Sequence, residues 1–181
     1  MRKSDRAYLR EELSQRFLPY LRSVGFEPAE DSSKPDGRSI FPFGTFARKH
    51  GSTSDIIEIQ FDKYSRPRFI INFRREPAEL IKEGQGIGPR NARLPKLTEF
   101  GAARFRWAQS FRLTPRPQSA RWFTMRTFFG LRSPKTCSKE VVDRLMNLFP
   151  QVEAWFKDGT IGEHLQALGI LVLVPPEGRS Q

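Results

Sequence analysis

Cysteine and histidine are scarce in this chain of 181 residues. The sequence contains one cysteine, Cys137, and two histidines, His50 and His164. A single thiol excludes an internal disulfide bond and a zinc site built from several cysteines. We therefore expect neither a structural metal nor a cofactor, and we interpret Cys137 as an incidental thiol close to the start of a helix.

Long apolar segments are also missing. No run of apolar residues approaches about 18, the length that a membrane-spanning helix requires. The N-terminal residues are charged and lead into an amphipathic pattern, whereas a signal peptide would continue into an apolar stretch. We expect a cytoplasmic protein of a bacterial-type cell that makes no membrane contact, and the sequence leaves its oligomeric state open.

Acidic residues are outnumbered by basic ones, 20 against 31, which gives a net charge of +11. Most of this excess lies in residues 82–135, which contain 12 basic and 2 acidic residues. Most of these basic residues are arginines, whose planar guanidinium group suits bidentate contacts with phosphate or carboxylate. The distribution of charge therefore predicts an anionic partner.

Apolar residues make up 38% of the sequence, and 16 residues are phenylalanines. This content is too high for a disordered chain, and the length suits one domain with a packed core. We expect a single α+β domain over residues 1–174, in which residues 84–101 form a loop or flap. Residues 175–181 are expected to be a flexible tail.

Residues 40–75 carry the clearest strand pattern, a three-strand antiparallel meander. Apolar and polar residues alternate in its second and third strands, which predicts one apolar and one polar face. The apolar set is Ile57, Ile59, Phe61, Phe69, Ile71 and Phe73. Similar patterns over residues 104–113 and 121–129 extend the prediction to an antiparallel sheet of about five strands, and residues 170–174 are a candidate edge strand.

Helices are expected before and after this sheet, packed on its apolar face. Leucine and phenylalanine recur at helical spacing from Leu9 to Leu21, with a kink or a tightened turn expected at Pro19 and a stop at Gly25. The late part predicts a helix that starts at Ser138 and ends before Pro150, and a second helix over residues 151–157. A capping-box pattern predicts a short helix over residues 160–168.

An arginine row is the leading candidate for a binding surface. Alternation places three of its members, Arg104, Arg106 and Arg112, on the face opposite Phe105, Trp107, Phe111 and Leu113. The row consists of Arg104, Arg106, Arg112, Arg116, Arg121 and Arg126. Nucleic acid is one expected partner and an acidic protein is the other, which would make the chain an immunity-like or regulatory protein. A solvated charged face explains the pattern equally well.

A magnesium-dependent nuclease is the alternative function. Asp36, Glu58 and Gln60 echo the split motif of the PD-(D/E)xK nucleases, in which two carboxylates hold the metal and a third side chain positions the attacking water. The simpler interpretation is that Glu58 and Gln60 are strand residues on the solvent side that pair with arginines across the hairpin. A non-enzymatic binding protein remains the first expectation.

Short motifs along most of the chain resemble a family of small, mostly bacterial proteins, the domain of unknown function 4304. The motifs are Leu21-x-x-x-Gly25-Phe26, Phe46, Ile57-x-Ile59-Gln60, Phe69-x-Ile71-Asn72, a strand around Trp122 and a closing helix over residues 141–156. The resemblance implies an α+β fold, and it supplies no activity and no catalytic residue. This chain departs from the family in a glycine-rich insert over residues 84–88 and in its high arginine content.

Overall fold

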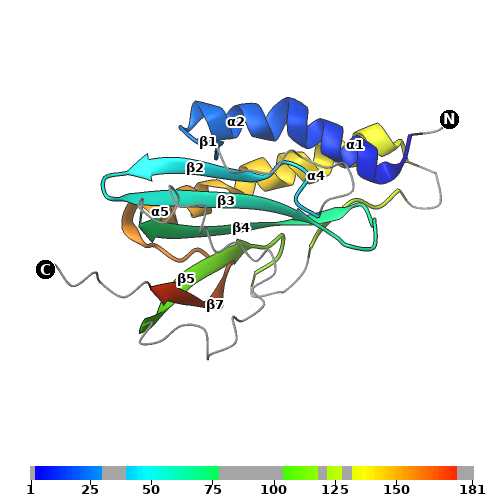
Figure 1. Cartoon of the computed structure of the whole chain (residues 1–181). Helices are drawn as coiled ribbons and strands as arrows, with labels where there is room; N and C mark the ends of the chain where they lie inside the picture. Colours follow the sequence, from blue (N-terminus) through cyan, green and yellow to red (C-terminus); the bar gives the residue numbers. More distant parts are fainter. Residues whose placement is uncertain (1–2, 30–39, 78–103, 118–121, 128–131, 175–181) are drawn as a thin grey trace, which may run out of the picture.

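The computed structural model describes residues 3–29, 40–77, 104–117, 122–127 and 132–174, with the backbone alone for residues 77, 104–110 and 169–174. Its strands form one antiparallel sheet in the order β1-β2-β3-β4-β5-β7, and β6 pairs with β4. The strands are β1 (Glu27–Pro28), β2 (Thr45–His50), β3 (Thr53–Phe61), β4 (Arg68–Pro77), β5 (Arg104–Leu113), β6 (Phe123–Thr124) and β7 (Leu165–Val174). The predicted α+β fold is confirmed (Figure 1).

The predicted meander consists of β2, β3 and β4. Ile57 lies opposite Phe73, and Ile59 lies opposite Ile71, so the apolar residues of both strands share one face. All four side chains are buried, and the helices cover this face of the sheet (Figure 1). The sheet has seven strands where about five were expected, because it adds the two-residue β1 and the edge strand β7, which the sequence offered only as a candidate.

The C-terminal part differs from the prediction, since the short helix expected over residues 160–168 is wrong. Leu165 begins β7, which pairs with β5 along its whole length as the edge strand of the described sheet. The capping-box residues instead form a turn, in which the Leu165 N–H donates to the Gly162 carbonyl at 3.0 Å. An apolar run without helical periodicity gains more by pairing beside β5, so the candidate edge strand begins five residues earlier than expected.

The N-terminal helical segment has three parts, α1 (Asp5–Glu12), the π-helix η1 (Leu13–Phe17) and α2 (Leu18–Ser23). The tightened turn expected at Pro19 is replaced by a widened one just before it, where the Leu18 N–H donates to the Leu13 carbonyl. Pro19 then occupies the first turn of α2, where its missing N–H costs no hydrogen bond. Gly25, with φ of +89°, ends the segment as predicted.

The late helices are α4 (Pro134–Leu148) and α5 (Pro150–Asp158). The predicted start at Ser138 is wrong, because Ser133 occupies the N-cap position and Pro134 opens the helix with a φ that suits its first turn. The predicted division at Pro150 is confirmed. Together with α1 and α2, these helices bury the apolar face of the sheet, where rings such as Phe73 and Phe111 stack 5.7 Å apart.

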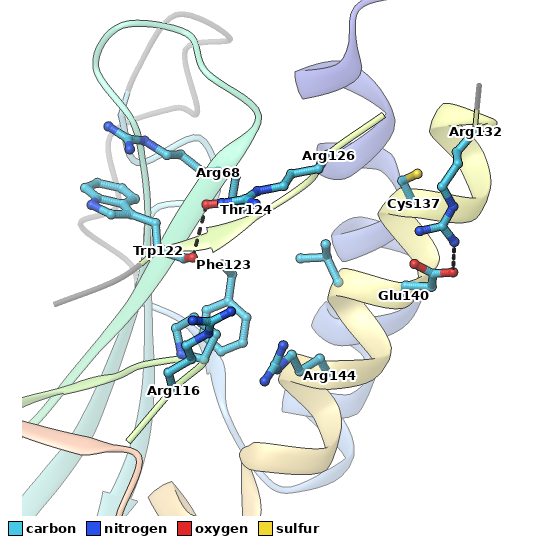
Figure 2. A pocket seen from close by; sticks show the side chains of 12 residues that line it. Arg68, Arg116, Trp122, Phe123, Thr124, Arg126, Arg132, Cys137, Glu140 and Arg144 are labelled. Atoms are coloured by element: carbon cyan, nitrogen blue, oxygen red, sulfur yellow. Dashed lines mark hydrogen bonds and ion pairs between the residues drawn. The ribbon is translucent and has the colours of Figure 1, made fainter. Parts of the chain in front are cut away.

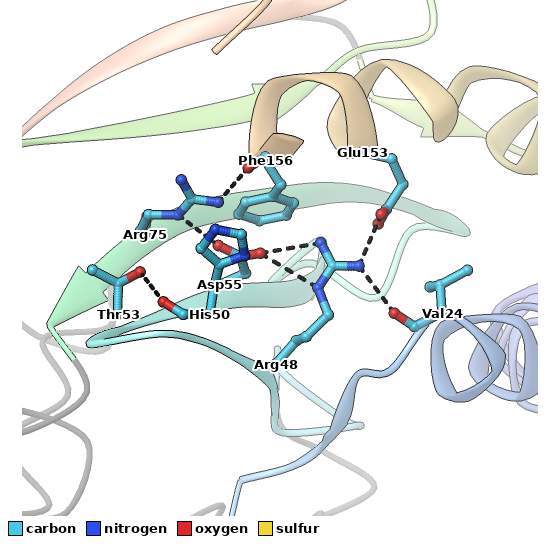
Figure 3. A network of polar contacts seen from close by, with 8 residues as sticks. All are labelled: Val24, Arg48, His50, Thr53, Asp55, Arg75, Glu153 and Phe156. Atoms are coloured by element: carbon cyan, nitrogen blue, oxygen red, sulfur yellow. Dashed lines mark hydrogen bonds and ion pairs between the residues drawn. The ribbon is translucent and has the colours of Figure 1, made fainter. Parts of the chain in front are cut away.

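An ionic cluster near the start of β3 joins the sheet to the helices. We call it the Asp55 cluster, and it consists of Arg48, Asp55, Arg75 and Glu153. Asp55 is fully buried and accepts hydrogen bonds from Arg48 Nη2 at 3.0 Å and from Arg75 Nε at 2.7 Å. Figure 3 shows both guanidinium groups turned toward this carboxylate. Arg48 also donates to Glu153 of α5 and to the Val24 carbonyl at the end of α2.

The Asp55 cluster is expected to be essential for stability. Asp55→Asn removes the one fully buried charge between two guanidinium groups. We expect a loss of about 3 kcal/mol in the free energy of unfolding, the lower end for a broken buried pair, because Arg48 and Arg75 are partly solvated. Urea denaturation followed by tryptophan fluorescence measures it. The exposed Asp158→Asn is the matched control and should leave the midpoint nearly unchanged, and equal midpoints for both variants would contradict the role of the cluster.

Candidate anion-binding site

A cavity of about 820 Å³ lies between β6 and the first half of α4. Its walls include Phe123 and Thr124 from β6, and Cys137, Glu140 and Val141 from α4. Its most frequent residue type is arginine, and five arginines line it: Arg68, Arg116, Arg126, Arg132 and Arg144. We call this the arginine cavity. Among the described residues that line it, only Glu140 is acidic, so these residues carry an excess of positive charge.

Antiparallel pairing explains why distant parts of the sequence meet here. Thr124 of β6 lies opposite Arg68, the first residue of β4. One residue further on, the Met125 N–H donates to the Pro67 carbonyl at 2.9 Å, which fixes the segment that carries Arg126. Helix α4 supplies the opposite wall, from which Glu140 and Arg144 project (Figure 2). Pairing of β6 with β4 therefore creates the cavity.

The five arginines divide into two groups by their partners. Arg68 is ion-paired with Asp62, and Arg132 is ion-paired with Glu140. The other three, Arg116, Arg126 and Arg144, are exposed, and within the part of the chain that the structure describes no carboxylate pairs with them. Three uncompensated guanidinium groups beside one cavity favour an anionic ligand.

Arg68 connects the cavity to the β3–β4 hairpin. Its Nε donates to Asp62 Oδ2 at 2.7 Å, and its guanidinium carbon lies 5.1 Å from the centre of the Trp122 ring. The second oxygen of Asp62 accepts the Tyr64 N–H at 2.7 Å. Burial acts to raise the pKa of Asp62, but these hydrogen bonds outweigh it and hold the pKa below its ordinary value of 3.8. Asp62 therefore fixes both Arg68 and the hairpin loop.

The structure places the predicted arginine row in different surroundings. Arg116 and Arg126 line the arginine cavity. Arg112 is half-buried on the second face of the sheet, where its Nε lies 3.3 Å from Asn72 Oδ1 and burial lowers its pKa. The side chains of Arg104 and Arg106 are not described, although the register puts both on the same face of β5 as Arg112. Arg121 lies outside the described residues.

Sequence reasoning did not single out Arg68, Arg132 or Arg144 as binding residues. No local pattern marks them, since Arg68 begins a strand, Arg132 precedes α4 and Arg144 lies within it. Arg132 lies in the basic segment 82–135, which was a general signal for it, but Arg68 and Arg144 lie outside that segment. Their meeting depends on the pairing of β6 with β4, and the two-residue β6 gives too short an alternation to reveal that pairing.

Two of the three residues of the nuclease hypothesis, Glu58 and Gln60, lie on the second face of the sheet. Glu58 is 2% exposed, with its Oε2 3.4 Å from Arg74 Nη1, and Arg74 is also paired with Glu76. Gln60 Oε1 accepts a hydrogen bond from Asn72 at 2.9 Å. Any metal ion at Glu58 would therefore have to displace Arg74.

Asp36 lies outside the described residues, so the triad itself remains a prediction. Within the described ranges, no group of three or more histidine, cysteine, aspartate or glutamate side chains is placed to hold a metal ion. The predicted polar face is real, because Glu58, Asn72 and Arg74 share it, but these residues are buried. The expectation that Glu58 pairs with an arginine across the hairpin is met by Arg74.

No protein-family model matches this chain, and neither a curated protein nor a solved structure matches it. The resemblance to the domain of unknown function 4304 family therefore stays a prediction. No helix among the described residues is long and apolar enough to cross a membrane. The function has to be inferred from the arginine cavity itself.

Asp62 gives this region a defined dependence on pH. Because the carboxyl has a lower pKa in the folded protein than in the unfolded chain, its contribution to stability is complete above about pH 5. The contribution is lost as the pH falls through the folded pKa. Asp62→Asn should therefore lower the free energy of unfolding at neutral pH, and the difference from the unsubstituted protein should shrink below about pH 4. Urea denaturation of both proteins across this range measures the difference, and a constant difference would contradict the assignment.

Proposed function

We propose that this chain is a non-enzymatic binding protein that contacts the phosphate groups of nucleic acid through its arginine cavity. The observation that carries the proposal is that Arg116, Arg126 and Arg144 line one cavity and that no carboxylate of the described residues pairs with them. Guanidinium groups bind phosphate through paired, charge-assisted hydrogen bonds. Such contacts release counterions and supply much of the affinity of a protein for nucleic acid.

An aromatic side chain beside the cavity favours nucleic acid over other anions. Trp122 is half-buried, lines the cavity and already has the Arg68 guanidinium beside its ring. Proteins that bind single strands combine cations along the phosphate backbone with rings on which bases stack. The Trp122 ring and five exposed or half-buried arginines line one cavity, so a base and the phosphates beside it could be bound together.

An acidic protein is the second candidate partner, because a carboxylate also fits an arginine pair. The two candidates differ in what the ligand offers, since an acidic protein has no bases for Trp122. A titration with polyglutamate, which carries carboxylates and no bases, separates them. Binding of polyglutamate without binding of nucleic acid would transfer the proposal to an acidic protein partner and overturn the nucleic-acid assignment.

The test is fluorescence polarisation with labelled DNA and RNA strands of about 12 nucleotides, a length that one binding domain covers. We expect binding that weakens with rising salt. The double substitution Arg126→Gln and Arg144→Gln should weaken binding and lower the slope of log K against log salt by about 0.7 for each lost phosphate contact on a single strand. A parallel gel should show that the strands stay intact with Mg²⁺ present.

Arg22→Gln is the matched control, because Arg22 is an exposed arginine on α2 that does not line the cavity. It removes one positive charge, as Arg126→Gln or Arg144→Gln alone does, and should leave the affinity close to that of the unsubstituted protein, whereas each of those single variants should weaken binding. If Arg22→Gln weakens binding as much as each cavity substitution does, net charge explains the binding and the cavity does not. Absence of salt-dependent binding to both DNA and RNA would overturn the proposal.

A further inference from the structure

Tyr64 is the most exposed large hydrophobic residue in the described part of the chain, with 66% of its surface accessible. It lies in the hairpin loop 63–67 that joins β3 to β4. Single exposed apolar residues are common on protein surfaces, so the exposure of Tyr64 points to a partner only together with the groups around its ring. The question is which partner suits its surroundings.

The loop holds Tyr64 in a fixed position. Asp62 accepts the Tyr64 N–H through its side chain and the Ser65 N–H through its carbonyl, at 2.7 and 3.3 Å. Ser65 has a φ of +60°, a conformation that few residues other than glycine adopt. These two hydrogen bonds to Asp62 stabilise the turn, so little ordering of the loop backbone is required on binding.

Two cations lie beside the Tyr64 ring. Lys63 Nζ is 4.9 Å from the ring centre, and the guanidinium carbon of Arg66 is 5.6 Å from it. The same combination occurs at the cavity, where Arg68 lies beside Trp122. Each ring therefore has positive charge next to an open aromatic surface, which suits a ligand that alternates flat rings with negative groups.

The hairpin loop and the arginine cavity adjoin each other. Tyr64 and Arg68 are four residues apart, so their backbones lie within about 14 Å. Asp62 is hydrogen-bonded to both, and the Pro67 carbonyl accepts the Met125 N–H next to Arg126. A single extended ligand can therefore cover the Tyr64 ring and enter the cavity past Trp122.

We propose that the ligand is a single-stranded nucleic acid and that Tyr64 stacks on an unpaired base outside the arginine cavity. This inference rests on the proposed function, which it makes specific. Bases inside a duplex already stack on their neighbours, so an exposed ring on a protein loop can stack only on a base that is unpaired. Arginines of the cavity then bind the phosphates that follow along the strand.

The test compares Tyr64→Ala with Tyr64→Phe, using fluorescence polarisation with a single strand and with a duplex of the same sequence. Stacking on an aromatic residue is worth about 1 to 3 kcal/mol per base, so Tyr64→Ala should weaken single-strand binding roughly 5-fold to 100-fold. The salt slope should not change, because no phosphate contact is lost. Tyr64→Phe should bind like the unsubstituted protein, and the duplex should bind more weakly and be insensitive to both variants.

Ile161→Ala is the control for loss of exposed apolar surface, since Ile161 is 62% exposed and lies outside the cavity lining. It should have no effect, and thermal unfolding should show all three variants equally folded. If Tyr64→Ala binds the single strand normally while Arg126→Gln and Arg144→Gln weaken it, the stacking role is wrong and the proposed function stands. Equal weakening of single strand and duplex would also overturn the stacking role, and no binding of any nucleic acid would overturn both proposals.

Discussion

The register of β3 against β4 is the constraint on which the rest of the structure depends. It places Ile57 opposite Phe73 on the face that the helices bury, and Glu58 opposite Asn72 on the other face. A shift of one residue would exchange the two faces and put charged groups into the aromatic core. The same pairing brings Asp55 beside Arg75 at one end of the two strands and forms the hairpin loop with Tyr64 at the other. The stabilising Asp55 cluster and the candidate site therefore lie at opposite ends of the β3–β4 pair.

The arginines of this protein fall into two groups, those paired with buried carboxylates inside the fold and those exposed at the cavity without a carboxylate partner among the described residues. Arg48 and Arg75 share a fully buried aspartate, and Arg74 lies between Glu58 and Glu76. Removing either partner from such pairs leaves an uncompensated charge in a region of low dielectric constant. Arg116, Arg126 and Arg144 at the cavity are exposed, so solvent and salt screen their mutual repulsion over about 8 to 10 Å. The fold tolerates an excess of positive charge there, where a ligand can reach it.

The sequence predicted much of the fold and little of the candidate site, for reasons that particular residues show. Alternation around Ile57 and Phe73 and the helical spacing from Leu9 to Leu21 are strong periodic signals, and both predictions are confirmed. The segment from Leu165 to Val174 shows neither strand alternation nor helical spacing, so the sequence predicts a strand only over its last five residues. Alternation reveals which face is polar but not whether that face is buried, so the sequence predicts a solvent-exposed second face. Glu58 and Arg74 are buried there because their opposite charges neutralise each other. Arg68 joins the cavity through long-range pairing, which no local pattern contains.

The start of α4 is a second feature that would favour an anion at the proposed site. Backbone N–H groups give the beginning of a helix a partial positive charge, so acidic residues stabilise it and basic residues oppose it. The first turn of α4 contains no acidic residue, and Arg132 and Lys135 lie at this end. Glu140 compensates Arg132 alone. This arrangement costs helix stability, and a bound phosphate would reverse the cost because it interacts favourably with the helix end and with the arginines. A ligand that binds only the folded protein also stabilises it by mass action. An anion bound in the cavity would therefore offset the repulsion between the arginines that attract it.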